Sequence, residues 1–156
     1  HLLDLLRFFN GDFHEYKSFI SNKFWNYDVE DNAFVLMRDK NGVIASIHST
    51  ATQWRHKFRI EITTKQALIE LKGILSGSKS YGKESLRIIK RSQKSLNGYK
   101  IKSRYYFNKD NSWKEEIDEF ANIILEKLPV KTGNILDALK VMDMIEKIYH
   151  ADKKGI

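Results

Sequence analysis

The sequence contains no cysteine, a single proline and no long apolar run among its 156 residues. Without cysteine there can be no disulfide scaffold, no thiolate metal site and no cysteine nucleophile. Because no apolar stretch approaches the roughly 18 residues that a membrane helix needs, we expect no membrane span. These absences are typical of a protein from a reducing compartment, and we expect a cytoplasmic location.

Several motifs of common catalytic sites are also missing. The sequence has no G-x-G-x-x-G turn for a dinucleotide, no G-x-S-x-G elbow for a serine nucleophile and no H-E-x-x-H pair for zinc. Segment Gly73–Gly77 resembles no P-loop, because the Lys-Ser/Thr pair that should follow the second glycine is absent. We therefore expect no metal site and no dinucleotide-binding turn within these residues.

Hydrophobic residues make up 42% of the chain, which favours a folded domain over a disordered segment. Their spacing predicts a helix, a series of strands and then two more helices. The expected helices cover His1–Asn10, Ser112–Leu128 and Asn134–Tyr149, and the expected strands cover Glu15–Asn22, Ala33–Arg38, Val43–Ala51, Lys57–Thr63, Ala67–Leu71, Ser85–Lys90 and Tyr99–Phe107. This grouping favours an α+β fold, an open, mainly antiparallel sheet with helices on one face.

Five local patterns make sharper predictions. Along Lys57–Thr63, alternation predicts Phe58, Ile60 and Ile62 inward and Arg59 and Glu61 outward. Asn41-Gly42 predicts a hairpin, because this pair accepts positive φ at little energetic cost. Ser112–Glu115 reads as a capping box at a helix start. The second helix should bury one apolar stripe, and the last helix should carry its apolar residues on one side. These stripes are Trp113, Ile117, Phe120 and Ile124, and then Ile135, Ala138, Met142, Ile145 and Tyr149.

His1 is the first candidate for chemistry. It stands directly inside an apolar helical pattern with no Ser, Thr, Asp or Asn cap before it, so we expect these residues to be the C-terminal piece of a longer polypeptide. A terminal histidine is commonly just frayed. The alternative is a general acid or base, since the ordinary pKa of histidine is near 6.5. Asp4, one turn on, shares its helix face and could orient the ring.

The second candidate is the segment Trp54-Arg55-His56, between two predicted strands. The simple interpretation is a hairpin turn that carries polar and aromatic side chains without a function. In an extended chain, however, Trp54 and His56 point the same way. An aromatic ring beside an imidazole suits a sugar or another polyol, which offers apolar ring faces together with hydroxyl groups.

Positive charge is the third feature. Between Lys72 and Arg104 there are ten basic residues and one acidic residue, Glu84, so this stretch carries more charge than the net +7 of the whole chain. The simple interpretation is a solvated face of the sheet. The alternative is a surface that binds nucleic acid or phosphate. Lys79 and Lys83, in the serine-rich part of this stretch, suggest an anionic or nucleotide-linked sugar.

The order of these elements, headed by His1-Leu2-Leu3-Asp4, resembles the C-terminal domain of the glucose–fructose oxidoreductase / inositol dehydrogenase (Gfo/Idh/MocA) family. That family carries Asp-x-x-x-His-x-x-Asp on a helix, and His1 and Asp4 match its last two positions. The hairpin Phe34–Ala51, the strand Phe58–Ile62 and the pattern Trp113-x-x-Glu116-x-x-x-Phe120 also fit. A departure follows that strand, where Thr64 and Ala67 stand in place of the usual Gly-x-x-Gly.

The resemblance implies that residues 1–156 form one substrate-binding and dimerisation domain of an NAD(P)-dependent sugar or polyol dehydrogenase. The N-terminal Rossmann domain of the family is absent from this sequence, and NAD or NADP would be bound mainly by it. We therefore expect the fragment alone to be inactive. The resemblance further implies that His1 is catalytic and that Trp54 and His56 face the substrate. We add Arg55, which lies between these two, as a substrate-binding residue, and we expect Asp4 to orient His1.

The resemblance also implies a homo-oligomer formed through the sheet face, and the alternating strands Lys57–Thr63 and Tyr99–Phe107 could supply that face. Two alternatives remain beside the dehydrogenase domain. One is a basic module that binds RNA or DNA, whose affinity would fall steeply with salt because phosphate contacts dominate such binding. The other is a non-catalytic scaffold with the same fold.

Overall fold

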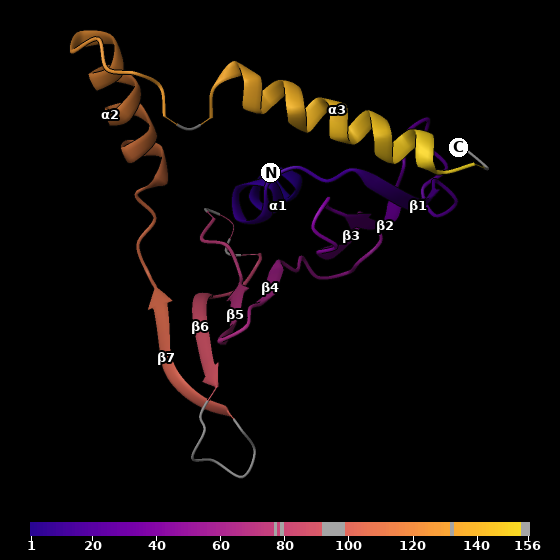
Figure 1. Ribbon diagram of the computed structural model, residues 1–156, viewed down its shortest axis with the longest axis horizontal. Coiled ribbons are helices and arrows are strands. Elements are labelled where there is room, and N and C mark those ends of the chain that lie inside the picture. The colour runs from indigo at the N-terminus through magenta and orange to yellow at the C-terminus, as the bar shows by residue number, and fades with distance from the viewer. Residues whose placement is uncertain (77, 79, 92–98, 132, 154–156) are drawn as a thin grey trace. The chain divides into compact units, whose positions relative to one another are not determined.

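The computed structural model describes residues 1–76, 78, 80–91, 99–131 and 133–153, without the side chains of residues 91 and 99–102 (Figure 1). Within them, three helices and seven strands follow one another close to the predicted positions. They are α1 (Leu2–Asn10), β1 (Glu15–Ser21), β2 (Asn32–Arg38), β3 (Ile44–Thr50), β4 (Arg59–Thr63), β5 (Ala67–Lys72), β6 (Glu84–Arg91), β7 (Tyr99–Phe107), α2 (Ser112–Leu125) and α3 (Ile135–Ala151).

The chain divides into two compact units, one of residues 1–53 with 128–156 and one of residues 54–127. The first contains the antiparallel sheet β1-β2-β3, and the second contains the antiparallel sheet β4-β5-β6-β7. The predicted α+β class and antiparallel pairing are confirmed. The strands form two sheets, whereas the pattern suggested a single one. That all 156 residues act as one substrate-binding domain stays a prediction.

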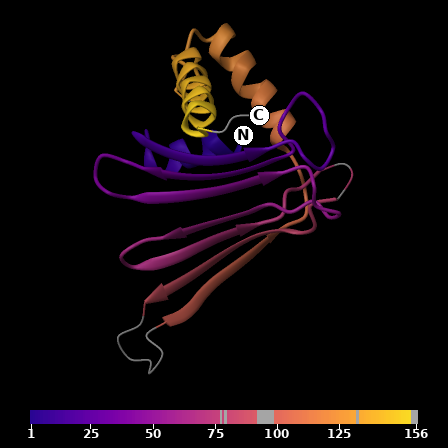
Figure 2. The ribbon, with the colours of Figure 1, turned by 90° about the vertical axis from the view of Figure 1, so that its right-hand side faces the viewer.

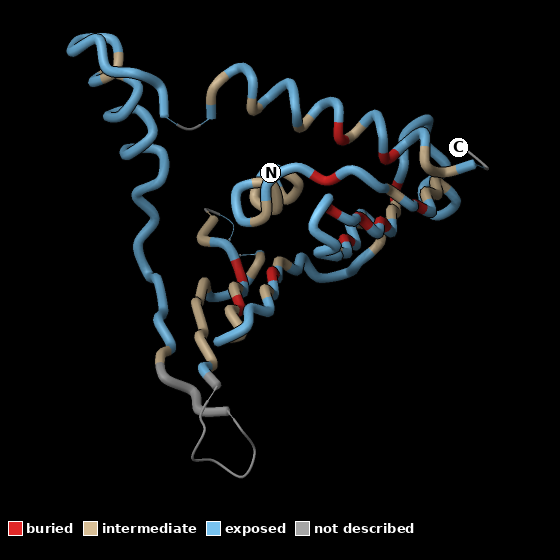
Figure 3. The backbone as a smooth tube through the Cα atoms, in the orientation of Figure 1, coloured by how far each residue is buried: buried red, intermediate tan, exposed pale blue. Residues whose placement is uncertain are grey.

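In the first unit, α1 and α3 cover one face of the three-stranded sheet (Figures 1 and 2). The core lies between these two helices and the sheet. The strands contribute to it with every second residue, because alternate residues of a strand face the same side. Its buried members are Phe13, Val35, Met37, Ile47, Met144 and Ile148, with Leu2, Leu3 and Leu6 of α1 packed against them. The tube coloured by burial shows this core as short red segments on facing elements (Figure 3).

The predicted hairpin joins β2 to β3. The Asp39 N–H donates to Val43 O at 3.0 Å, which leaves three residues in the loop. Gly42, at φ +85°, is the glycine that takes the left-handed conformation, as three-residue loops require. The Asp39 carboxylate also accepts from the backbone N–H of Asn41 and Val43, at 2.8 and 2.7 Å. These bonds fix the register of the hairpin.

The side of α3 that meets the sheet is not the apolar side named from the sequence. Met144 and Ile148 are buried against the sheet, and Ile145 is half-buried. Ile135 and Met142, which belong to the predicted stripe, are 81% and 61% exposed. The helix carries apolar residues on more than one face, so the 3.6-residue pattern alone does not say which face meets the core.

The predictions for α2 are also corrected. Its expected buried stripe is exposed. Trp113 is 75% exposed and Phe120 is 61% exposed. The capping box is wrong because the helix N-cap is Asn111, which makes no side-chain cap bond. Instead, Asp110 Oδ1 accepts from the Ser112 N–H and hydroxyl, at 3.0 and 2.6 Å. An Asp-Asn pair precedes the serine, and these residues are at least as good as serine at a helix start.

The second unit confirms the alternation predicted for β4. Ile60 is buried and Ile62 half-buried, while Arg59 and Glu61 face outward. Antiparallel register then places Glu70 of β5 beside Glu61 and beside Arg87 of β6 on the same sheet face. This face is charged, and the opposite face carries the isoleucines.

Candidate functional site

His1 stands at the N-terminal end of α1, at the edge of a cavity of about 430 Å³ in the first unit. The cavity lies among α1, α3 and the ends of the three strands. Its lining includes Leu2, Leu3, Ile20, Val35, Ile47 and Ile148, with Glu30, Asn32, Ser49 and Thr50 as polar members. Apolar walls with a few polar groups are the usual composition of a small-molecule site. The cavity therefore makes the surroundings of His1 the first candidate site.

Two carboxylates shape the polar side of this cavity. The Tyr149 hydroxyl donates to Glu30, and burial together with this bond raises the pKa of Tyr149 to about 12. Tyr149 therefore remains a hydrogen-bond donor at neutral pH. The buried Asp31 carboxylate accepts from the backbone N–H of Phe24 and Trp25, at 2.8 and 2.9 Å. Asp31 thus holds the loop between β1 and β2 rather than offering a charge to a ligand.

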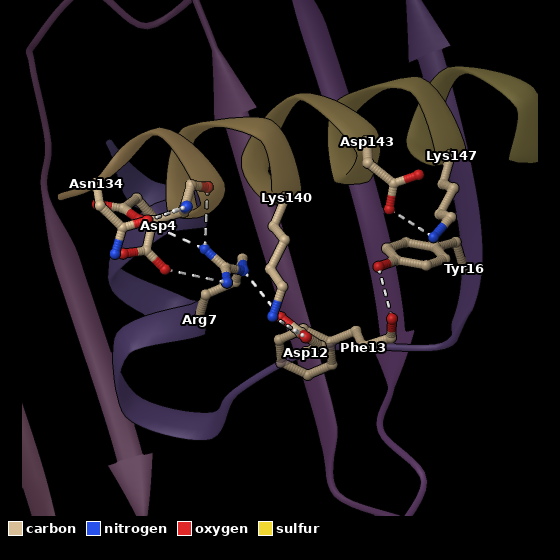
Figure 4. Close-up of polar contacts among 10 residues, drawn as sticks. Asp4, Arg7, Asp12, Phe13, Tyr16, Asn134, Lys140, Asp143 and Lys147 are labelled. Carbon is tan, nitrogen blue, oxygen red and sulfur yellow. Dashed lines mark hydrogen bonds and ion pairs between the residues drawn. The ribbon is translucent and has the colours of Figure 1, made fainter. Parts of the chain in front are cut away.

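Helix α1 is held in place by Arg7, whose side chain is only 10% exposed. Its Nε donates to Asp12 Oδ1 at 3.0 Å, and its Nη1 donates to the Asp137 carbonyl at 3.2 Å (Figure 4). Lys140 of α3 reaches Asp12 Oδ2 at 2.9 Å. The hydrogen bond from Lys140, with a smaller contribution from Arg7, lowers the pKa of Asp12 below its usual value. These contacts join α1 to α3 on the helix side of the sheet.

The other end of the Arg7 contact is fixed by the start of α3. The Asn134 side chain caps this helix by accepting from the backbone N–H of Leu136 and Asp137, at 2.9 and 3.1 Å. Asp137 is thereby held in the first turn, where its carboxylate lies 3.6 Å from Arg7 Nη2. Asp4 lies 3.9 Å from Arg7 Nη1, so its contact is with this network. That Asp4 orients the His1 ring stays a prediction.

Sequence analysis missed Arg7 and its partners. Arg7 and Asp137 are 130 residues apart, and no short motif links positions at such a separation. Glu30 and Tyr149 were missed for the same reason, because 119 residues separate them. An arginine inside a mostly apolar helix was the one available signal, since a buried charge needs a partner.

The remaining predicted residues lie in the second unit. Trp54 is 92% exposed, and Arg55 and His56 are exposed. The His56 ring meets the ring of Tyr81, with 5.0 Å between centroids and 51° between planes. This contact was not predicted, although Tyr81 lies in the basic stretch that the sequence singled out. Lys83, two residues further on, is exposed, and Lys79 lies outside the described residues.

Part of the basic stretch is used within the sheet. Buried Glu70 accepts Arg59 at 2.9 Å and Lys72 at 3.1 Å, and Arg87 lies 3.6 Å away. Burial alone would raise the pKa of Glu70, but Lys72 and its neighbouring cations lower it below the usual value. Lys72 and Arg87 therefore neutralise an internal carboxylate, which leaves less of the stretch for an external anion.

The structure thus assigns the predicted site residues to two units, with His1 and Asp4 in the first and Trp54, Arg55, His56 and Lys83 in the second. Across the residues that the structure describes, no three His, Asp or Glu side chains gather as metal ligands would. No helix within the same residues is long and apolar enough to cross a membrane.

Residues 1–70 match the family model of the GFO/IDH/MocA C-terminal domain. This match confirms the resemblance that the sequence indicates. A search of curated protein sequences returns no significant match. The whole chain, in contrast, is similar to parts of many solved structures.

Three of these structures are dehydrogenases. UDP-N-acetylglucosamine 3-dehydrogenase GnnA from Acidithiobacillus ferrooxidans gives a TM-score of 0.80 at 18% identity, over 99% of this chain and 47% of that protein. Levoglucosan dehydrogenase, in complex with NADH and levoglucosan, gives a TM-score of 0.76 at 16% identity, over 99% of this chain and 46% of that protein. The WlbA dehydrogenase from Bordetella pertussis, in complex with NADH and UDP-GlcNAcA, gives 0.69 at 15% identity, over 100% and 41%.

At these identities the likeness establishes the fold. The chain spans somewhat less than half of each of these proteins, 41% to 47% of their length.

Proposed function

We propose that this chain, whose first 70 residues match the GFO/IDH/MocA C-terminal domain, is the substrate-binding half of an NAD(P)-dependent sugar or polyol dehydrogenase. The observation that carries the proposal is the position of His1. It lies in the matched segment, at the edge of a ligand-sized cavity. A nucleotide-binding domain, the other half of such an enzyme, would complete the site.

In this proposal His1 exchanges the proton of the substrate hydroxyl. The imidazole suits this role because its ordinary pKa lies close to neutral pH, where it can both accept and donate a proton. Asp4, on the same helix, would orient it. The nicotinamide, when bound, supplies the hydride chemistry. This sequence has no glycine-rich dinucleotide turn, so we assign NAD or NADP mainly to the other domain.

The substrate we propose is a sugar, and more specifically an anionic or nucleotide-linked one. Two of the similar structures are dehydrogenases associated with UDP-linked sugars, and a third is a levoglucosan dehydrogenase. Exposed Arg55 and Lys83 supply positive charge in the second unit, and Trp54 and His56 supply rings. These four residues, with Lys79, are our proposed substrate-binding residues.

We also propose a homo-oligomer. We assign its interface to the outer face of the three-stranded sheet in place of the strands Lys57–Thr63 and Tyr99–Phe107, which belong to the other sheet. Four large apolar side chains on this face are exposed: Phe19 at 79%, Phe34 at 50%, Leu36 at 55% and Ile44 at 66%. Register places them together, because Phe19 pairs with Phe34 while Leu36 lies two residues on. Contiguous apolar surface of this kind is typical of an interface.

The nucleic-acid alternative has less support. Lys72 and Arg87 of the basic stretch, together with Arg59, already contact Glu70 within the sheet. Binding through phosphate contacts would be strongest at low salt, so filter binding of RNA and DNA at two salt concentrations tests this alternative. We expect no retention at either concentration.

The proposed function is tested by NADH or NADPH formation with a panel of sugars, using the protein joined to its nucleotide-binding domain. We expect turnover with a nucleotide-linked sugar and less with the neutral sugar alone. The 156-residue chain by itself should give none. Absence of hydride transfer with every sugar, under conditions where cofactor binds, would favour the non-catalytic scaffold instead.

A further inference from the structure

The two ends of the segment between β5 and β6 are held together by described residues. The Gly73 N–H donates to Phe58 O at 3.1 Å, and Glu84 accepts the Leu75 N–H at 2.9 Å. Gly73 has φ +72°, and a Cβ added there would lie 2.3 Å from the carbonyl oxygen of Lys83. The two ends of the segment therefore approach so closely that only glycine fits at position 73.

This construction brings Tyr81 against His56. Their rings come from segments 25 residues apart and lie 5.0 Å from centroid to centroid. Tyr81 is half-buried, whereas His56 is exposed, so the tyrosine supports one side of an imidazole that faces solvent on the other. A supported, exposed ring is a stacking surface for a flat heterocycle.

A cavity of about 520 Å³ is lined in part by residues of the same segment. Gly82 and Lys83, which follow Tyr81 directly, line it together with Ser76, Phe107, Asn108 and Asp110. The size is within the usual range for a small-molecule site. Its chemistry is mixed. Lys83 suits a phosphate, and Asp110 can accept hydrogen bonds from hydroxyl groups. The Asn108 amide can both donate and accept hydrogen bonds.

The Asp110 carboxylate is kept ionised. Hydrogen bonds from the hydroxyl and the backbone N–H of Ser112 lower its pKa below the usual value. At neutral pH this carboxylate repels a phosphate but accepts a vicinal pair of hydroxyls, as a ribose presents them. Lys83 and Asp110 thus favour a ligand that carries phosphate at one place and hydroxyl groups at another.

We propose that the second unit binds a nucleoside diphosphate, with its base on the His56 ring supported by Tyr81 and its ribose and phosphates beside Asp110 and Lys83. This inference rests on the proposed function, and it identifies the residues that would recognise the nucleotide part of the substrate. Tyr81 is a positioning residue in it, because it acts through His56.

The test is calorimetric titration of the chain with uridine diphosphate, uridine and inorganic pyrophosphate. We expect uridine diphosphate to bind at least about tenfold more tightly than either fragment, since base stacking and a charge-assisted bond each contribute about that factor. Tyr81→Leu should weaken its binding about tenfold, and Tyr81→Phe should not, because the ring contact needs no hydroxyl. Tyr27→Leu, at an exposed tyrosine in the first unit, is the matched control.

Lys83→Gln separates the two halves of the ligand. This variant should weaken the binding of uridine diphosphate and of pyrophosphate about equally and leave the binding of uridine unchanged. The inference is overturned if uridine diphosphate does not bind at millimolar concentration, if it binds no more tightly than pyrophosphate, or if Tyr81→Leu leaves its affinity unchanged. Any of these results, found together with oxidation of a sugar that depends on His1, would leave the proposed dehydrogenase function standing.

Discussion

Arg7 donates from Nη1 to the backbone carbonyl of Asp137, 3.2 Å away, and so joins α1 to α3 across 130 residues of chain. The same guanidinium bonds to Asp12, which Lys140 of α3 also contacts. Because His1 begins α1, whatever fixes this helix also fixes the proposed catalytic imidazole. The first two predictions concern this network.

Replacing Arg7 with methionine should lower the free energy of unfolding by about 1–3 kcal/mol, since bonds to carboxylates are lost in a nearly buried place. Arg7→Lys should lose less stability than Arg7→Met, because lysine keeps the positive charge but lacks the planar guanidinium. Arg38→Met is the control, since the Arg38–Glu15 pair is exposed on both sides. Urea unfolding measures all three. Equal losses for Arg7→Met and Arg38→Met would refute the anchoring role.

The lowered pKa of Asp12 predicts a loss of stability in acid. Its folded-state pKa lies below the ordinary value of 3.8, so the unfolded chain binds the proton first. The contribution is therefore fully present above about pH 5 and is lost as the pH falls through 3.8 and then through the folded-state pKa. The urea midpoint should drop less between pH 6 and pH 3 in Asp12→Asn than in the parent. The same drop in both would contradict this prediction.

Glu70 should be more important to stability than its neighbour Glu61. Its side chain is 7% exposed and contacts three cations, whereas that of Glu61 is 43% exposed. Glu70→Gln leaves these cations facing one another, and we expect a loss of about 1–3 kcal/mol. Glu61→Gln should change stability by about 0–1 kcal/mol. Thermal unfolding of both variants decides this, and similar values would show that the cluster around Glu70 is not cooperative.

The proposed oligomer interface can be tested at one aromatic residue. In the parent, the Phe34 ring stacks on the His48 ring with 3.9 Å between centroids. Phe34→Lys replaces this ring with a charge in the centre of the outer apolar face. We expect the dissociation constant of the oligomer to rise at least about tenfold, because an unpaired charge in an apolar interface is costly. Leu136→Lys, at a 65% exposed position of α3, is the control. Sedimentation equilibrium measures both, and an unchanged mass for Phe34→Lys would exclude this face.

Much of this fold could be predicted from local patterns. Alternation along β4 identified Ile60 and Ile62 as inward, and the Asn-Gly pair identified the β2–β3 hairpin. These predictions succeed because a strand has two faces and a glycine turn is a local preference. The Asp39 carboxylate, four residues before Val43, adds bonds that close this loop, and the Asn-Gly pattern did not predict them.

Other features depend on partners that no local pattern specifies. The buried side of α3 is set by which residues meet the sheet, and Met144 rather than Met142 does so. The contacts of Arg7 with Asp137 and of His56 with Tyr81 join distant segments of the chain. For the candidate site, sequence analysis therefore identified His1 and His56 but not the residues that hold them.

The central claim is that His1 performs proton transfer in a sugar dehydrogenase. It is tested most directly by the kcat of His1→Asn in the protein joined to its nucleotide-binding domain, with His150→Asn as the control for an exposed histidine. We predict that kcat falls about 10²- to 10⁴-fold in His1→Asn, with little change in KM, and stays unchanged in His150→Asn. A His1→Asn enzyme with the kcat of the parent would contradict the claim.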